Sequence, residues 1–87
     1  MKTTSRKQFN QEAAVETIKK AGDRWPSSFV PRSQVPKFTG GLIAVGTIAN
    51  KDSEGTGPNG AFRVGRQVCY PVDSLCDWLI GRLEVQA

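Results

Sequence analysis

Histidine is absent from the 87 residues of this chain, and with it the commonest general base and the commonest metal ligand in proteins. Cysteine occurs only twice, which is too few for a structural zinc site. No apolar run approaches the roughly 18 residues that a membrane-spanning helix needs. These absences argue against histidine-based catalysis and zinc-stabilised folds, and we expect a protein without enzymatic activity, metal or cofactor.

The two cysteines, Cys69 and Cys76, are predicted to be reduced, partly buried thiols of an intracellular protein, although one disulfide between them is geometrically feasible. Residues 1–8 form a polar, basic tail without the hydrophobic segment of a secretory signal. We therefore expect a cytoplasmic protein with no membrane partner, and the short chain predicts a single folded domain with a small core.

Basic residues outnumber acidic ones by 12 to 8, and the middle of the chain is basic whereas its end is acidic. Residues 29–70 carry a net charge of +3, whereas residues 71–87 carry −2. A basic segment followed by an acidic one indicates one face that binds an anion and another that is turned away from it.

A helix is predicted over about residues 10–21, because apolar side chains recur there at helical spacing. Asn10 is a typical N-cap, and Gly22 stands where such a helix commonly ends. The apolar stripe consists of Ala14, Val15, Ile18 and Ala21. It is too narrow for an isolated helix, so the helix needs a docking surface, and Trp25 is predicted to anchor this segment to the core.

A short helix is predicted to end at Gly40, with two alternative starts. Pro31 suits the first helical position, but Pro36 then lies inside the helix and removes a backbone hydrogen bond. With Ser33 as the N-cap instead, Pro36 falls in the tolerated first turn. The expected buried side chains are Val35 and Phe38.

The pair Gly40 and Gly41 is predicted to turn the chain sharply into a second helix over about residues 45–53, because glycine adopts positive φ without strain. Its expected buried stripe, at i, i+3 and i+4, is Val45, Ile48 and Ala49. The other side of this helix carries three polar residues at the same spacing, all able to form hydrogen bonds and none acidic: Thr47, Asn50 and Lys51. The pattern is typical of two helices joined by a tight turn.

A glycine-rich loop follows, and two short strands are predicted over about residues 62–70, joined by a turn at Gly65–Gln67. The apolar residues that alternate along these strands are Phe62, Val64, Val68 and Tyr70, of which Phe62 and Tyr70 are assigned to the core. Pro71 ends the second strand, and Asp73 is predicted to cap a last helix. The buried face of that helix is Leu75, Trp78 and Leu79, with Arg82 in its final turn and a tail over residues 83–87.

In this order the pieces resemble the winged helix-turn-helix DNA-binding domains of excisionases and AlpA-type regulators, within the MerR-like superfamily. The matching stretches are "FVPRSQVPKFTGG", "LIAVGTIANKDSEGTGP", "FRVGRQVCYP" and "VDSLCDWL". They cover residues 29–82 and leave residues 1–28 outside. The resemblance implies an α+β, mostly α fold with a two-stranded β-hairpin wing. The chain departs from the family's pattern at Ala44, where a serine often caps the second helix.

The resemblance implies binding of double-stranded DNA by a phage or mobile-element regulator, either a transcriptional regulator or an excisionase-like architectural factor. A recognition helix over about residues 45–53 enters the major groove, and a wing over about residues 62–70 reaches the neighbouring groove or its phosphates. The expected DNA-binding residues are Arg32, Ser33, Lys37, Thr47, Asn50, Lys51, Arg63, Arg66 and Gln67. Further expected partners are a second copy of the chain or an integrase.

Two other interpretations compete with DNA binding. The same polar helix face is also compatible with a non-catalytic module that docks a partner protein. A nucleotide-binding phosphate loop at "TGGLIAVGTIANK" is disfavoured, because Gly41 and Gly46 are followed by Thr47 and not by the lysine of that motif.

Overall fold

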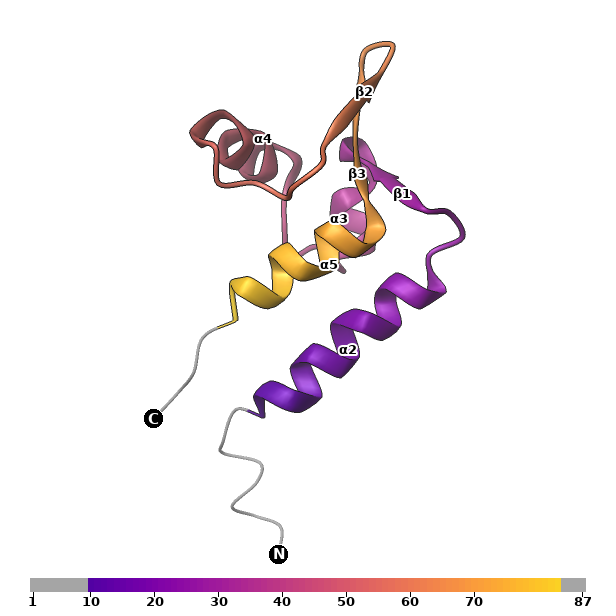
Figure 1. Cartoon of the computed structure of the whole chain (residues 1–87), viewed down its shortest axis with the longest axis vertical. Helices are drawn as coiled ribbons and strands as arrows, with labels where there is room; N and C mark the ends of the chain where they lie inside the picture. The colour runs from indigo at the N-terminus through magenta and orange to yellow at the C-terminus, as the bar shows by residue number, and fades with distance from the viewer. Residues whose placement is uncertain (1–9, 84–87) are drawn as a thin grey trace, which may run out of the picture.

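The computed structural model describes residues 10–83, which form a small α+β domain with a three-stranded antiparallel sheet (Figure 1). The predicted tail at residues 1–8 and most of the predicted C-terminal tail lie outside the described residues. The elements, in chain order, are α2 (Gln11–Arg24), β1 (Phe29–Pro31), a 3₁₀ turn η1 (Arg32–Gln34), α3 (Val35–Phe38), α4 (Val45–Glu54), β2 (Phe62–Val64), β3 (Gln67–Pro71) and α5 (Val72–Gly81).

Helix α2 is longer than predicted and packs against α5 along one side (Figure 1). Asn10 is the N-cap, as expected, and its Oδ1 accepts a hydrogen bond from the Ala13 amide at 2.9 Å. The prediction that Gly22 ends the helix is wrong, because α2 continues to Arg24. Gly22 lies where α2 meets α5, and a Cβ there would lie 2.7 Å from Cys76 Sγ. The glycine therefore allows the two helices to approach closely.

Replacement of Gly22 by alanine is expected to destabilise the fold by about 1–2 kcal/mol in net terms, because the added methyl group overpacks the contact with α5. This loss outweighs the roughly 1 kcal/mol that alanine gains as the better helix former. Gly46→Ala is the matched control, because nothing lies within 4 Å of a Cβ at that helical position, and it is expected to stabilise by about 0.5–1 kcal/mol. Urea unfolding of both variants measures the difference. Equal stabilisation by the two alanines would contradict the close α2–α5 contact.

Trp25 anchors α2 to the core, as predicted. Its ring packs edge-on against Phe38 at 5.4 Å between centroids, and its Nε1 donates to the Phe29 carbonyl at 2.9 Å. The chain is thereby held at the start of β1.

The short first helix combines the two predicted alternatives. Pro31 precedes a 3₁₀ turn, η1, and α3 then begins at Val35, so Pro36 lies in the first helical turn and no helical hydrogen bond is lost. Ser33 is not the cap that one alternative expected. Val35 and Phe38 are buried, as predicted.

The corner between α3 and α4 uses both glycines at positive φ, 64° for Gly40 and 89° for Gly41. Thr39 closes this corner, because its Oγ1 donates to the Val35 carbonyl at 2.9 Å and accepts from the Ile43 amide at 3.0 Å. The direction in which α4 leaves α3 is thus set by backbone conformation and one side chain.

Helix α4 has one buried residue, Ile48. Ala49 is half-buried, but Val45, predicted to belong to the buried stripe, is 41% exposed. The buried stripe of α4 is therefore reduced to Ile48 and the half-buried Ala49.

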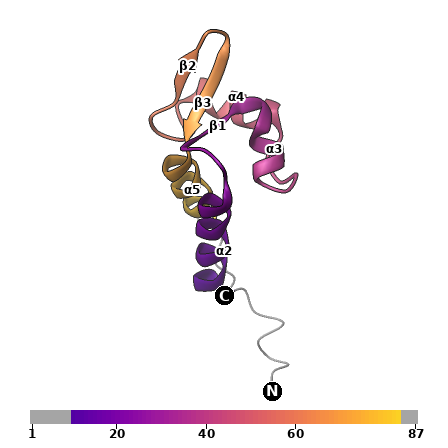
Figure 2. The ribbon, with the colours of Figure 1, turned by 90° about the vertical axis from the view of Figure 1, so that its right-hand side faces the viewer.

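The sheet has three strands in the order β1-β3-β2, one more than the predicted hairpin. Val30 of β1 pairs with Tyr70, and Arg63 of β2 pairs with Val68. The assignment of Phe62 to the core is wrong: its side chain is 39% exposed and packs edge-on against Phe29 outside the core. Beyond β1 the β2–β3 hairpin extends alone, which leaves no layer to cover β2 (Figure 2).

Helix α5 begins at Val72 directly after Pro71, so Asp73 lies in the first turn and does not cap it as predicted. Its carboxylate still lies at the positive end of the helix dipole. Trp78 of α5 donates from Nε1 to the Thr56 carbonyl at 2.7 Å, which attaches the loop after α4 to α5.

One hydrophobic core joins α3, α4, β1, β3 and α5, and its fully buried side chains are Tyr70, Ile48, Leu75, Val30 and Val35. Cys69 and Cys76 are free and buried. Burial, reinforced by nearby carboxylates, raises the pKa of the Cys76 thiol, which keeps it protonated and unreactive.

Candidate nucleic-acid interface

The outward side of α4 is a stripe of small and polar residues. Gly46, Asn50 and Ser53 follow one another at i, i+4 and i+7, and all three are exposed. At 100° per residue, this stripe lies opposite Ile48, the residue by which α4 enters the core. Asn50 is therefore the one member of the predicted trio that points directly away from the protein.

Thr47 and Lys51 occupy the flank of α4 next to this stripe. Thr47 is exposed and also lines a hollow of about 580 Å³ between α2, the α3–α4 corner and α5. Lys51 is half-buried, and its Nζ lies 3.6 Å from the Glu54 carboxylate. A partly exposed pair of this kind contributes little to stability, so the ammonium is able to leave Glu54 for another anion.

The β2–β3 hairpin carries the remaining predicted side chains. Its two-residue turn consists of Gly65, at φ 59°, and Arg66, and Gln67 begins the second strand. Arg63, Arg66 and Gln67 are all exposed. Within residues 10–83, neither arginine has a carboxylate within 4.0 Å, so both guanidinium groups are available to an external anion.

The remaining predicted residues belong to η1 and α3. Ser33 and Lys37 are exposed. Arg32 is different, because its guanidinium is directed into the protein, where Nε donates to the Tyr70 hydroxyl at 2.8 Å and Nη2 donates to Asp52 at 2.6 Å. Arg32 is thereby committed to contacts within the fold.

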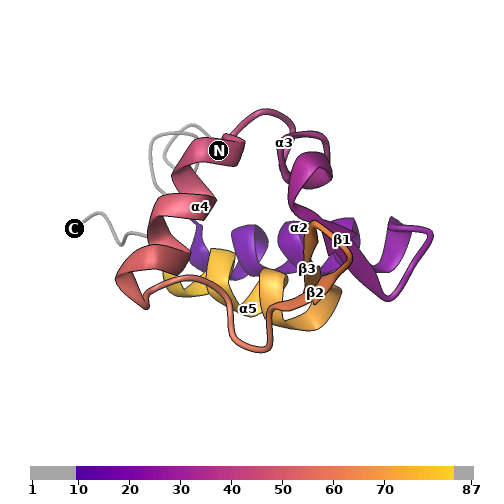
Figure 3. The same cartoon turned by 90° about the horizontal axis from the view of Figure 1, so that it is seen from above.

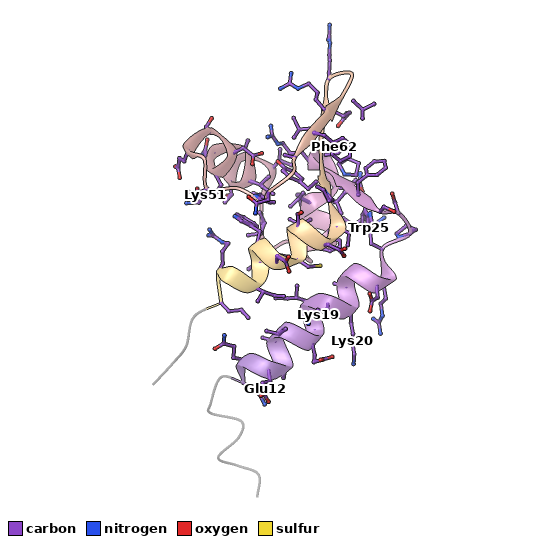
Figure 4. The ribbon with its side chains drawn as sticks, viewed as in Figure 1. Glu12, Lys19, Lys20, Trp25, Lys51 and Phe62 are labelled. Atoms are coloured by element: carbon purple, nitrogen blue, oxygen red, sulfur yellow. The ribbon has the colours of Figure 1, made fainter. Side chains whose placement is uncertain are left out.

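Helix α4 and the hairpin lie at the same end of the molecule, whereas α2 lies at the other (Figures 1 and 2). Viewed from above, α4 lies to the left and the β2–β3 hairpin to the right, with α3 close to the hairpin (Figure 3). Figure 4 shows Lys51 on α4 and Phe62 on β2 at this end, and Lys19 and Lys20 on α2 at the other. The fold therefore brings to one end of the molecule the two elements, α4 and the hairpin, that carry Thr47, Asn50, Lys51, Arg63, Arg66 and Gln67.

Two residues that sequence reasoning did not assign to the site, Asp52 and Tyr70, turn out to connect its parts. The Tyr70 hydroxyl donates to Asp52 Oδ2 at 2.5 Å, and Asp52 follows Asn50 by two residues on α4. The partners lie 18 to 38 residues apart, so no local pattern indicates them. The sequence contained one sign of an internal partner for Asp52, because this acid lies one turn after Ile48 and therefore on the core-facing side of α4.

Among residues 10–83 there is no group of three side chains able to hold a metal ion. No helix in this range has the length and apolar character required to cross a membrane.

Comparison of the chain with protein-family models, curated proteins and solved structures finds no match. The resemblance to excisionase and AlpA-type domains therefore remains a prediction from the residues.

Proposed function

We propose that this chain is a non-enzymatic, sequence-specific protein that binds double-stranded DNA through a winged helix-turn-helix, with α4 as the recognition helix and the β2–β3 hairpin as the wing. The observation that carries the proposal is the grouping of an exposed helix and an exposed, arginine-bearing hairpin at one end of the molecule. DNA offers matching features, a groove wide enough for a helix beside a regular row of phosphates.

The outward stripe of α4 suits close approach to base edges. Gly46 adds no side chain, so the helix is able to lie deep in the groove, and Asn50 extends from the centre of the stripe. An asparagine amide can pair with adenine through two hydrogen bonds, which specifies the base. Lys51 on the flank is long enough to reach a phosphate or a guanine.

The hairpin supplies positive charge at a second point of contact. Arg66 stands at the turn and Arg63 on an edge strand, and neither is held by an internal carboxylate. A narrow β-ribbon with arginine at its end fits the minor groove or the phosphates that border it. Gln67, next to Arg66, is able to donate to the same phosphates.

Further phosphate contacts are available near α3. Ser33 and Lys37 are exposed, and Ala44, the N-cap of α4, makes no side-chain hydrogen bond to the helix start. The first amides of α4 are therefore free to donate to a DNA phosphate, an anion that the helix dipole also favours.

A handful of phosphate contacts gives weak binding by one copy, so specific action requires a dimer or several copies bound side by side. This arrangement is consistent with the regulator of a phage or mobile element that the sequence predicts, acting on transcription or together with an integrase.

A protein-docking role is the second candidate, and one observation favours it. Leu42 at the α3–α4 corner is 76% exposed and borders the hollow that Thr47 lines. In that role, the basic surface is incidental and the apolar corner contacts the partner.

Fluorescence anisotropy with labelled random-sequence duplex DNA at two salt concentrations distinguishes the candidates. With three phosphate contacts, a fourfold rise in salt is expected to weaken binding by roughly 40-fold. Binding that is absent at low salt, or that is insensitive to salt, would contradict the DNA proposal and favour protein docking.

A further inference from the structure

Three side chains from separate elements meet in a closed ring of hydrogen bonds, which we call the tether: Arg32 of η1, Asp52 of α4 and Tyr70 of β3. Arg32 donates to Tyr70 at 2.8 Å and to Asp52 at 2.6 Å, and the Tyr70 hydroxyl donates to the same Asp52 oxygen at 2.5 Å. All three bonds involve a charged group, which makes them strong and strict in direction.

Helix α4 depends on directional contacts because its apolar contact with the core is small. Ile48 is its one buried residue, and an apolar contact resists rotation about the helix axis only weakly, since burial has no preferred direction. Asp52 lies one turn beyond Ile48, on the same side of the helix. The bonds of Asp52 therefore fix the rotation of α4 about its axis.

The tether also connects α4 to the hairpin. Tyr70 lies on β3, next to Cys69, which pairs with Phe62 of β2. Gly57, in the loop after α4, packs so closely against Asp52 that a Cβ there would overlap the carboxylate. The carboxylate is thus enclosed, with side-chain exposure of 21%, and has little freedom to choose another position.

We propose that Arg32, Asp52 and Tyr70 are positioning residues that set the orientation of Asn50 relative to the hairpin, and so determine how α4 meets DNA. The inference rests on the proposed function. Asn50 precedes Asp52 by two residues, so it lies on nearly the opposite side of α4. Any rotation that releases Asp52 displaces Asn50 from the groove, while Arg66 on the hairpin stays where it was.

Tyr70→Phe tests the proposal, because it removes the hydroxyl and keeps the buried ring. Affinity for duplex DNA is expected to fall about fivefold to tenfold, with most of the salt dependence retained, since the hairpin still contacts phosphates. Asn50→Ala is expected to weaken binding by the wild-type protein and to have almost no further effect in the Tyr70→Phe background. Asp52→Asn, of nearly the same shape, is expected to behave in the same way.

A role of Tyr70 in stability alone predicts a different result. In that case Tyr70→Phe reduces the folded fraction without changing how Asn50 contacts DNA. Asn50→Ala then weakens DNA binding by the same factor in both backgrounds. Such additivity in protein that is folded by circular dichroism would overturn the proposal, as would wild-type affinity of Tyr70→Phe.

The tether itself is measurable without DNA, because Tyr70 is the chain's single tyrosine. Burial first, and then the hydrogen bond to Asp52, raise the pKa of Tyr70 to about 12. The ultraviolet absorbance of the phenolate is expected to show this pKa in the wild type and a lower one in Asp52→Asn, which has lost the carboxylate. Equal values near 10 in both proteins would show that the tether is absent.

The DNA titration and the tyrosine titration together show whether the proposed DNA binding or the tether is wrong. Absent DNA binding together with an elevated, Asp52-dependent tyrosine pKa contradicts the proposed function and leaves the tether intact. DNA binding together with an unperturbed tyrosine contradicts the tether alone.

Discussion

Replacement of Ile48 by alanine is expected to lower the free energy of unfolding by about 3–4 kcal/mol, the range for a large aliphatic side chain removed from a well-packed core. Ile48 is completely buried and is the one buried residue of α4. For a domain of this size, the loss corresponds to a fall in melting temperature of about 12–32 °C. Thermal unfolding followed by circular dichroism measures it.

Val45→Ala is the matched control on the same helix. Val45 is 41% exposed, and alanine is the better helix former, so the stability is expected to stay within about 0.5 kcal/mol of the wild type. A sequence pattern that places both residues in one buried stripe predicts large losses for both. Similar losses for the two variants would therefore contradict the placement of α4.

Simultaneous replacement of Arg63 and Arg66 by alanine is expected to weaken binding to duplex DNA by about 30-fold to 100-fold and to reduce the salt dependence by about two phosphate contacts. Both side chains are exposed and, within residues 10–83, lack an internal ion pair. Their removal should therefore leave the stability of the fold nearly unchanged. Anisotropy titrations at several salt concentrations give both quantities.

Lys19→Ala with Lys20→Ala is the control for net charge. These two exposed lysines lie on α2, at the far end from the hairpin (Figure 4), and their loss changes the net charge by the same amount. We expect affinity to fall less than threefold, through long-range attraction alone. Equal losses in the two double variants would mean that binding follows net charge and that the hairpin is not a specific contact.

Local chemistry made several elements predictable from the sequence. Asn10 as a cap, Gly40 and Gly41 as a corner and Gly65 in a hairpin turn each follow from the backbone conformation that the residue favours. Val35 with Phe38, and Leu75 with Leu79, follow from helical spacing. In each case the determining interaction lies within a few residues along the chain.

Features that depend on distant packing were missed. Strand β1 exists because Val30 pairs with Tyr70, 40 residues later, and three residues ending in proline give no strand pattern of their own. Gly22 resembles a helix end, but its function is contact with Cys76 on α5. Phe62 resembles a core aromatic, and only the position of β2 at the edge of the sheet leaves it exposed.

In the candidate site, too, local features were predictable and features that depend on distant packing were not. The polar character of α4 and the arginines of the hairpin were visible in the sequence, since they require only residue type and approximate secondary structure. The inward direction of Arg32 and its ring of hydrogen bonds with Asp52 and Tyr70 were not visible, because they form only when η1, α4 and β3 come together.

The most direct test of the account is a map of the backbone amides that respond when a short duplex is added, observed by NMR on the isotope-labelled protein. The largest changes are expected around Asn50 on α4 and at the Gly65–Gln67 turn of the hairpin, with α2 unaffected. Responses on α2 or around Leu42 without any at Asn50 or the hairpin turn, or none at any DNA concentration, would contradict the assignment of this surface to DNA.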